Sequence, residues 1–289
     1  MTTAIQDRAM LVNLSISAWT ASKKDNKVSN AVKANQAASA KAGWFNKRLI
    51  EPSNLDPINQ IEGRARAMHY KMTLPWGDNG DRLLPSQAYF DYTEQLRHLR
   101  AEHEAAVMAF VAQYPQLVQD ARKMLGAMYE PADYPEAGRI AERFSMNAVF
   151  SPVATADDFR VDIGQEAVDE IKKSITAAAE QRLAGATRDC WARLYEVVGN
   201  MAERLHDPKA IFKDSLVGNI EALLELLPKL NVANDKSLTF ACKMVQEWLI
   251  VAPSDLRKNK KLRAFTADKA LEILEQIKPW TLNTNAATT

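Results

Sequence analysis

Residues 164–206 read GQEAVDEIKKSITAAAEQRLAGATRDCWARLYEVVGNMAERLH and decide the fold class. Along this stretch, side chains recur at alternating steps of three and four, the spacing that lines one face of an α-helix. The positions on this stripe are Val168, Ile171, Ile175, Ala178, Arg182, Ala186, Cys190, Leu194, Val197, Met201 and Leu205. At 1.5 Å per residue the helix would be a rod of roughly 60 Å. We therefore predict a mainly α protein whose long helices form a coiled-coil-like arm or bundle.

A second long stripe occupies residues 86–114. Its positions are Tyr89, Tyr92, Leu96, Leu99, His103, Ala106 and Phe110. Pro115 follows, and because its missing N–H costs nothing in a first helical turn, we expect a new helix to begin there. Long rods of this kind pair either within one chain, as an antiparallel arm, or between chains. We favour a homo-oligomer with its seam, the stripe that faces the second copy, at Val168, Ile171, Ile175, Leu194 and Met201.

Two short segments, at about 11–20 and 144–150, alternate apolar and polar side chains with the period of a β-strand. Pairing with each other is the simplest explanation, so we expect a small two-stranded antiparallel sheet covered by helices. Further helical patterns cover 28–42, 57–72, 208–227, 237–251 and 266–278, with a basic loop before the last. We expect a mixed helical domain at 1–163, a long helix with a C-terminal helical bundle at 164–280, and a disordered tail at 281–289.

The overall charge is balanced: 37 Lys and Arg oppose 36 Asp and Glu, for a formal net charge of +1. This argues against a dedicated nucleic-acid coat, which carries a clear positive excess. However, the first 100 residues hold 14 basic and 9 acidic side chains, so positive charge is concentrated there. No leader pattern opens the chain and no apolar run approaches the ~20 residues of a membrane helix, so we expect a cytoplasmic protein. Cys190 and Cys242 are accordingly expected to be thiols.

Sequence motifs typical of catalytic, nucleotide-binding or metal-binding sites are missing. Neither a phosphate-binding glycine loop nor a dinucleotide fingerprint occurs. His98 and His103 are five residues apart, which on a helix puts them on different faces, and no zinc-ligand spacing is present. The carboxylates Asp157, Asp158 and Asp162 could hold a divalent cation, but helix capping accounts for them without one. We therefore expect no catalytic residue, no metal, no cofactor and no enzymatic activity.

A basic segment near the N-terminus is the clearest hint of a binding site. Cations beside exposed aromatic rings are what phosphate contact combined with base stacking requires. The candidate nucleic-acid contacts are Lys23, Lys24, Lys27, Lys33, Trp44, Phe45, Lys47 and Arg48. The alternative is a solvated helix face whose two aromatic side chains dock that helix on the protein. A second basic cluster at 257–263 lacks aromatic side chains and is expected to be a solvated connector.

The connector LPWGDNGDRLLP at residues 74–85 has an unusual composition for a surface loop. Its prolines and glycines restrict the backbone path, and its apolar side chains supply area for contact. Trp76, Arg82 and Leu83 are therefore candidates for a loop that anchors a partner protein. The alternative is that these side chains pack over a junction between helices.

Four blocks of sequence resemble a known family. TLPW at 73–76, GDRLLP at 80–85, FSP at 150–152 and DDFRV at 157–161 are similar to an uncharacterised family of proteins from tailed phages and prophages. Members are typically encoded beside a MoxR-type AAA+ ATPase and a cobaltochelatase-like von Willebrand A protein. The resemblance covers most of the first 200 residues, and the family supplies no catalytic motif. It implies a helical accessory that acts with an ATPase or another phage protein in the host cytoplasm.

Stripes and resemblance together lead to one functional hypothesis. We expect a non-enzymatic phage accessory or assembly protein that self-associates through its long helices. It would act as an adaptor for the MoxR-type ATPase, the von Willebrand A protein or another phage protein. The competing hypothesis is a single-strand nucleic-acid-binding accessory of phage replication or recombination that uses the basic segment. Neither hypothesis involves a membrane.

Overall fold

The computed structural model describes residues 5–36, 38–39, 41–161, 164–207 and 209–282. The chain divides into two compact units, and only the described residues of each unit are discussed below. Unit 1 collects segments 1–13, 69–92 and 149–289, and unit 2 collects segments 14–68 and 93–148. Both units are thus assembled from segments distant in the sequence. The division expected from the sequence, at 1–163, 164–280 and 281–289, remains a prediction.

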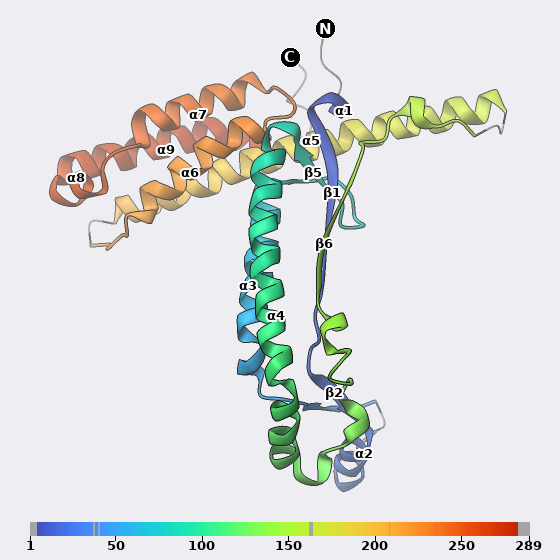
Figure 1. Cartoon of the computed structure of the whole chain (residues 1–289). Helices are drawn as coiled ribbons and strands as arrows, with labels where there is room; N and C mark the ends of the chain where they lie inside the picture. Colours follow the sequence, from blue (N-terminus) through green and yellow to red (C-terminus); the bar gives the residue numbers. More distant parts are fainter. Residues whose placement is uncertain (1–4, 37, 40, 162–163, 208, 283–289) are drawn as a thin grey trace. The chain divides into compact units, whose positions relative to one another are not determined.

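The mainly α fold predicted from the periodicity is confirmed. Nine α-helices lie in the described part of the chain, and the two longest, α4 and α5, have 37 and 42 residues (Figure 1). The helices are α1 (Ile5–Arg8), α2 (Asn26–Asn35), α3 (Asp56–Met72), α4 (Tyr89–Leu125), α5 (Gln165–His206), α6 (Ser215–Leu230), α7 (Lys236–Leu249), α8 (Pro253–Lys258) and α9 (Lys260–Leu282). None of these helices is both long and apolar enough to cross a bilayer, within the residues described.

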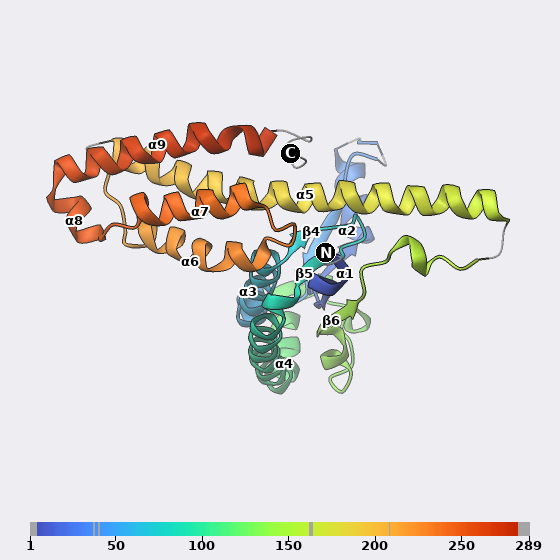
Figure 2. The same cartoon turned by 90° about the horizontal axis from the view of Figure 1, so that it is seen from above.

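Unit 1 is built on a four-helix bundle. The C-terminal half of α5 packs against α6 and α9, and α7 packs against α6 and α9, so the four helices surround one core (Figure 2). α5 contributes a stripe that is almost completely buried, including Cys190, Leu194 and Met201. Asp235 begins α7 by accepting hydrogen bonds from the backbone N–H groups of Ser237 (2.8 Å) and Leu238 (3.1 Å). This N-cap satisfies donors that the first helical turn leaves unpaired.

A four-stranded sheet has the order β4–β5–β1–β6. Its strands are β4 (Leu74–Pro75), β5 (Arg82–Pro85), β1 (Ala9–Ser17) and β6 (Ser145–Ser151). The predicted pairing of the segments at about 11–20 and 144–150 is confirmed, because β1 and β6 are neighbours in the sheet. The sheet is nevertheless larger than the predicted two strands. The connector supplies β4 and β5, which pair antiparallel, and β5 pairs antiparallel with β1.

Unit 2 combines parts of α3 and α4 with α2 and a second, two-stranded sheet. That sheet pairs β2 (Ser22–Asp25) with β3 (Phe45–Arg48) in antiparallel register. The core of the unit includes an aromatic cluster in which Phe110 contacts Tyr114 and Phe144, with ring centroids 5.8 and 5.6 Å apart. The hydroxyl of Tyr134 donates to the backbone carbonyl of Leu49 at 2.7 Å, which ties the segment after α4 to the segment after β3.

Pro115 does not begin a new helix, contrary to the prediction. It lies inside α4, which continues without interruption to Leu125. Proline in a helix interior costs about 3 kcal/mol, because one hydrogen bond is lost and the ring crowds the preceding turn. Tyr114 before it and Ala121 and Leu125 after it are all buried on one side of the helix. Burial on both sides of Pro115 offsets this local cost and keeps the helix continuous.

Several other predicted boundaries are corrected. α2 ends at Asn35 rather than at residue 42, and its single buried residue, Ser29, provides little packing to extend it. α6 begins at Ser215, and Ile211 is 95% exposed outside it. The predicted basic loop is helical and forms parts of α8 and α9. Residues 281 and 282 end α9, and the remainder of the predicted tail, 283–289, lies outside the described residues.

Candidate functional site

The long helix α5 changes its surroundings halfway along. All of its buried residues lie from Ala186 onward, in the half that forms the bundle. The predicted seam is therefore split between two environments. Leu194 and Met201 are 1% and 0% exposed inside the bundle of their own chain, so they are not open to a second copy. Val168, Ile171 and Ile175 are only partly covered and do not belong to the hydrophobic core of unit 1.

Three contacts mark the level at which the bundle ends. Cys190 Sγ donates to the carbonyl of Leu230, the last residue of α6, at 3.8 Å. Trp191 Nε1 donates to Asp235, the N-cap of α7, at 2.9 Å. The Trp191 ring also stacks on Trp280 near the end of α9, with centroids 5.4 Å apart. The N-terminal half of α5 continues past the ends of these three helices (Figure 2).

The connector side chains lie inside unit 1. Trp76 is 8% exposed and Leu83 is fully buried, both within the bundle-side core cluster. Arg82 donates from Nε to the Thr73 hydroxyl (2.7 Å), and its guanidinium lies 4.7 Å from the centroid of the Tyr70 ring. Burial lowers the pKa of Arg82, an effect to which neighbouring Arg193 adds. This burial agrees with the alternative in which the connector side chains pack on the protein itself. Trp76 and Leu83 are not exposed for contact with a partner protein.

In unit 2, the structure divides the basic segment into two opposite faces. Directly paired residues of an antiparallel ladder lie on the same face, and Lys23 pairs with Lys47. Both ammonium groups lie against Asp133, at 2.5 and 2.7 Å. Lys47 is 6% exposed and also donates to the Met128 carbonyl at 2.7 Å. Lys23 and Lys47 are therefore held by structural ion pairs, and Lys47 is not available to phosphate.

The opposite face of this ladder is open to solvent. Lys24, Arg48 and Trp44 are exposed, and Lys24 Nζ lies 5.5 Å from the centroid of the Trp44 ring. Phe45 is 39% exposed, but it pairs with Asp25 and therefore lies on the same face as Lys23 and Lys47. Lys27 is exposed and Lys33 partly covered on α2, between the two strands in the chain. Five of the eight predicted nucleic-acid contacts lie here: Lys24, Trp44 and Arg48 on this face, and Lys27 and Lys33 on α2.

Asp133 was not anticipated from the sequence. It lies in a short 3-10 helix between two prolines, 110 residues from Lys23. Burial would raise the pKa of Asp133, but the hydrogen bonds from Lys23 and Lys47 hold it below its ordinary value. The strand alternation of Trp44, Asn46 and Arg48 is the one signal that could have separated the two faces in advance.

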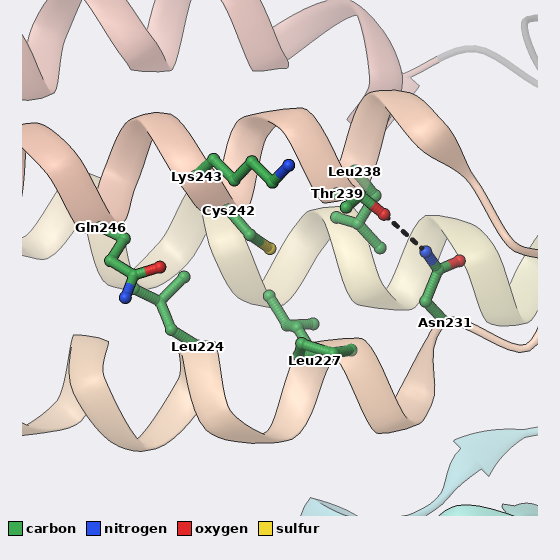
Figure 3. Close-up of a pocket in the computed structure, with 9 residues that line it drawn as sticks. Leu224, Leu227, Asn231, Leu238, Thr239, Cys242, Lys243 and Gln246 are labelled. Atoms are coloured by element: carbon green, nitrogen blue, oxygen red, sulfur yellow. Dashed lines mark hydrogen bonds between the residues drawn. The ribbon is translucent and has the colours of Figure 1, made fainter.

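A pocket of 210 Å³ between α6 and α7 is mainly apolar (Figure 3). The side chains of Asn231 and Thr239 hydrogen-bond to each other across its end at 3.3 Å. The Cys242 thiol points into it (Figure 3). Burial raises the pKa of Cys242 to about 11 and that of Cys190 to about 12. Both are free thiols, and so high a pKa leaves very little of the reactive thiolate at neutral pH.

Ionisable side chains elsewhere form structural pairs. His103 and Glu62 are buried between α4 and α3, with Nε2 and Oε1 3.4 Å apart, while His98 is exposed. Asp158 accepts hydrogen bonds from the backbone N–H (2.7 Å) and the hydroxyl (2.8 Å) of Thr155 and so caps a short 3-10 helix. Asp162 of the same carboxylate group lies outside the described residues. Among the residues described, no group of three or more His, Cys, Asp or Glu is placed to hold a metal ion.

Comparison with known proteins identifies a family. A family model described as "Protein of unknown function (DUF3150)" matches residues 6–247, which is most of the chain. The chain therefore belongs to the DUF3150 family. No curated protein matches the sequence. No solved structure matches it either.

Proposed function

We propose that this DUF3150 protein is a non-enzymatic assembly protein that self-associates through the N-terminal half of α5. One observation carries the proposal. The partly exposed stripe of Val168, Ile171 and Ile175 continues the helix face that is buried in the bundle from Ala186 onward. Apolar side chains that continue a core-facing stripe gain free energy when another surface removes them from water.

A second copy of the same segment is the occupant that fits best. In a two-fold antiparallel pair centred near Ile171, Ile175 of one copy lies opposite Val168 of the other. A two-fold interface requires a surface that complements itself in this way. Closure around this axis gives a dimer rather than an open chain of subunits.

The wider role follows from the resemblance of the blocks at 73–85 and 150–161 to proteins of tailed phages and prophages. Such proteins are typically encoded beside a MoxR-type AAA+ ATPase and a von Willebrand A protein. That context supports an adaptor that presents a phage-encoded assembly to one of these two proteins in the host cytoplasm. A non-enzymatic role is in keeping with Cys190, which is buried, and with His103, which is paired with Glu62.

Size-exclusion chromatography with light scattering tests self-association. The wild type is expected at twice the 32.3 kDa chain mass at micromolar concentration. Ile171→Asp/Ile175→Asp adds two charges to the stripe, where their desolvation is costly, and should give a monomer with unchanged circular dichroism. Ser174→Asp/Ala177→Asp adds the same charge at two exposed positions of the same helix and should leave the dimer intact. A monomeric wild type, or a double stripe variant of unchanged mass, contradicts the proposal.

A further inference from the structure

One face of the β2–β3 ladder in unit 2 gathers an exposed indole and cations. Lys24 pairs with Asn46 and Ser22 with Arg48, so these four side chains share a face. Trp44 precedes Asn46 by two residues and lies on the same side, where Lys24 Nζ is 5.5 Å from its ring centroid. Trp44 is 66% exposed, although a tryptophan ring ordinarily contributes a large buried area to a core.

The positive charges on this face form no ion pairs with the described part of the chain. The ion pairs of this segment engage Lys23 and Lys47, on the other face. Within the described residues, no carboxylate forms an ion pair with Lys24, Lys27 or Arg48. The structure thus separates a neutralised face, packed on Asp133, from a face whose cations remain available to a polyanion.

A shallow apolar groove adjoins the indole. It has a volume of 360 Å³, and its lining includes Val32, Gln36, Ala38, Gly43, Trp44 and Phe45. Val32 and Phe45 are 54% and 39% exposed. A molecule bound to this face would therefore contact the Trp44 ring, the apolar groove beside it and the cations along the ladder.

We infer that this face binds single-stranded nucleic acid, with a base stacked on Trp44 and the backbone phosphates on Lys24, Lys27 and Arg48. Bases present an aromatic face to every stacking partner, and phosphates supply the negative charge that these cations lack. A duplex hides its base faces, so the exposed indole favours a single strand. An acidic peptide would satisfy the cations but would leave the indole and the groove without a role.

Fluorescence anisotropy with a fluorescein-labelled oligo(dT) 20-mer tests the inference on the full chain. Three phosphate contacts predict a log–log salt slope of about −2, at roughly −0.7 per contact on a single strand. Trp44→Ala should weaken binding at least about fivefold, the lower bound for losing one stacked base. Trp44→Phe keeps an aromatic face and should retain most of the affinity. Lys24→Glu/Arg48→Glu should abolish binding at 150 mM salt.

A matched control separates a site from general charge attraction. Lys260→Glu/Lys261→Glu makes the same charge change at two exposed positions of α9 in unit 1 and should leave the affinity unchanged. Thermal melts verify that all variants remain folded. No binding by the wild type at 50 mM salt overturns the inference. It is also overturned if Trp44→Ala binds as well as the wild type, or if poly-glutamate competes as strongly as oligo(dT), since the site would then recognise charge alone.

Discussion

Lys47 and Asp133 form a buried ion pair, with Nζ 2.7 Å from Oδ2 and side chains only 6% and 5% exposed. Lys47 also lies 3.5 Å from Asp25, and its hydrogen bond to the Met128 carbonyl satisfies a further donor position. The pair joins β3 to the 3-10 helix of Asp133, which is 86 residues further along the chain. A lysine in the basic segment is therefore part of the framework of unit 2.

Lys47→Met should destabilise the protein by about 3 kcal/mol, because it leaves the buried carboxylate of Asp133 with only one lysine partner. Lys24 is exposed on β2, next to Lys23, the residue that pairs with Lys47. Lys24→Met should change the free energy of unfolding by less than about 0.5 kcal/mol. Urea denaturation followed by circular dichroism measures both values. Equal effects of the two substitutions would contradict the structural role of Lys47.

Acid should weaken unit 2 through the same carboxylate. Burial opposes ionisation of Asp133, but hydrogen bonds from Lys23 and Lys47 lower its pKa below the ordinary value of 3.8. A carboxylate with a lowered folded-state pKa stabilises the fold above the unfolded value, and this contribution is lost as pH falls through the folded pKa. The melting temperature should therefore drop below about pH 4. Asp133→Asn should melt lower at pH 7 but show a smaller further drop at pH 3.

Trp76 offers a direct test of the packing of the connector. Because its side chain lies in the core of unit 1, Trp76→Ala should lower the free energy of unfolding by about 3–5 kcal/mol. Trp44→Ala, at an exposed indole, should change it by less than about 0.5 kcal/mol. If Trp76→Ala has wild-type stability, the connector is an exposed loop and its role as a partner anchor returns.

The two cysteines should react slowly in the folded protein. With burial raising the pKa of Cys242 to about 11, only about 0.1% of it is thiolate at pH 8, and Cys190 is more strongly suppressed. Ellman's reagent should therefore label the two thiols rapidly only after addition of urea. Rapid labelling of one thiol in buffer would identify a local opening of the bundle at that residue.

Periodicity predicted the elements well where one face of a segment is buried. The stripe of α5 and the alternation of β1 and β6 both reflect such burial, and both elements are present. The same periodicity runs unchanged through both halves of α5. It therefore could not distinguish Leu194, buried by its own chain, from Ile171, which is only partly covered. Periodicity reports that a face is apolar, and not what covers it.

The candidate sites depended on contacts that local sequence does not encode. The division of the basic segment requires Asp133, which is distant in the chain from Lys23 and Lys47. β4 and β5 are two and four residues long and contain prolines, so their composition resembles a turn. They become strands because β5 pairs with β1, with Leu11 opposite Leu83. Both features arise from tertiary pairing, which overrides local propensity.

Pro115→Ala should stabilise the protein, because the structure places this proline inside a continuous α4. Alanine restores a backbone donor to the carbonyl of Val111 and removes the crowding of the ring, together worth about 3 kcal/mol in a helix interior. The unfolded chain gains freedom when proline is lost, which offsets about 0.4–1 kcal/mol. A net gain of about 2 kcal/mol is expected in urea denaturation.

Pro57→Ala is the matched control for this prediction. Pro57 occupies the first turn of α3, where a backbone N–H has no partner within the helix, so alanine regains no hydrogen bond. Its substitution should be neutral or destabilising by up to about 1 kcal/mol. If Pro115→Ala behaves like Pro57→Ala, then α4 is interrupted at residue 115 and a second helix begins there. Stabilisation by Pro115→Ala alone supports one continuous helix, held by the burial of Tyr114 and Ala121 on either side of the proline.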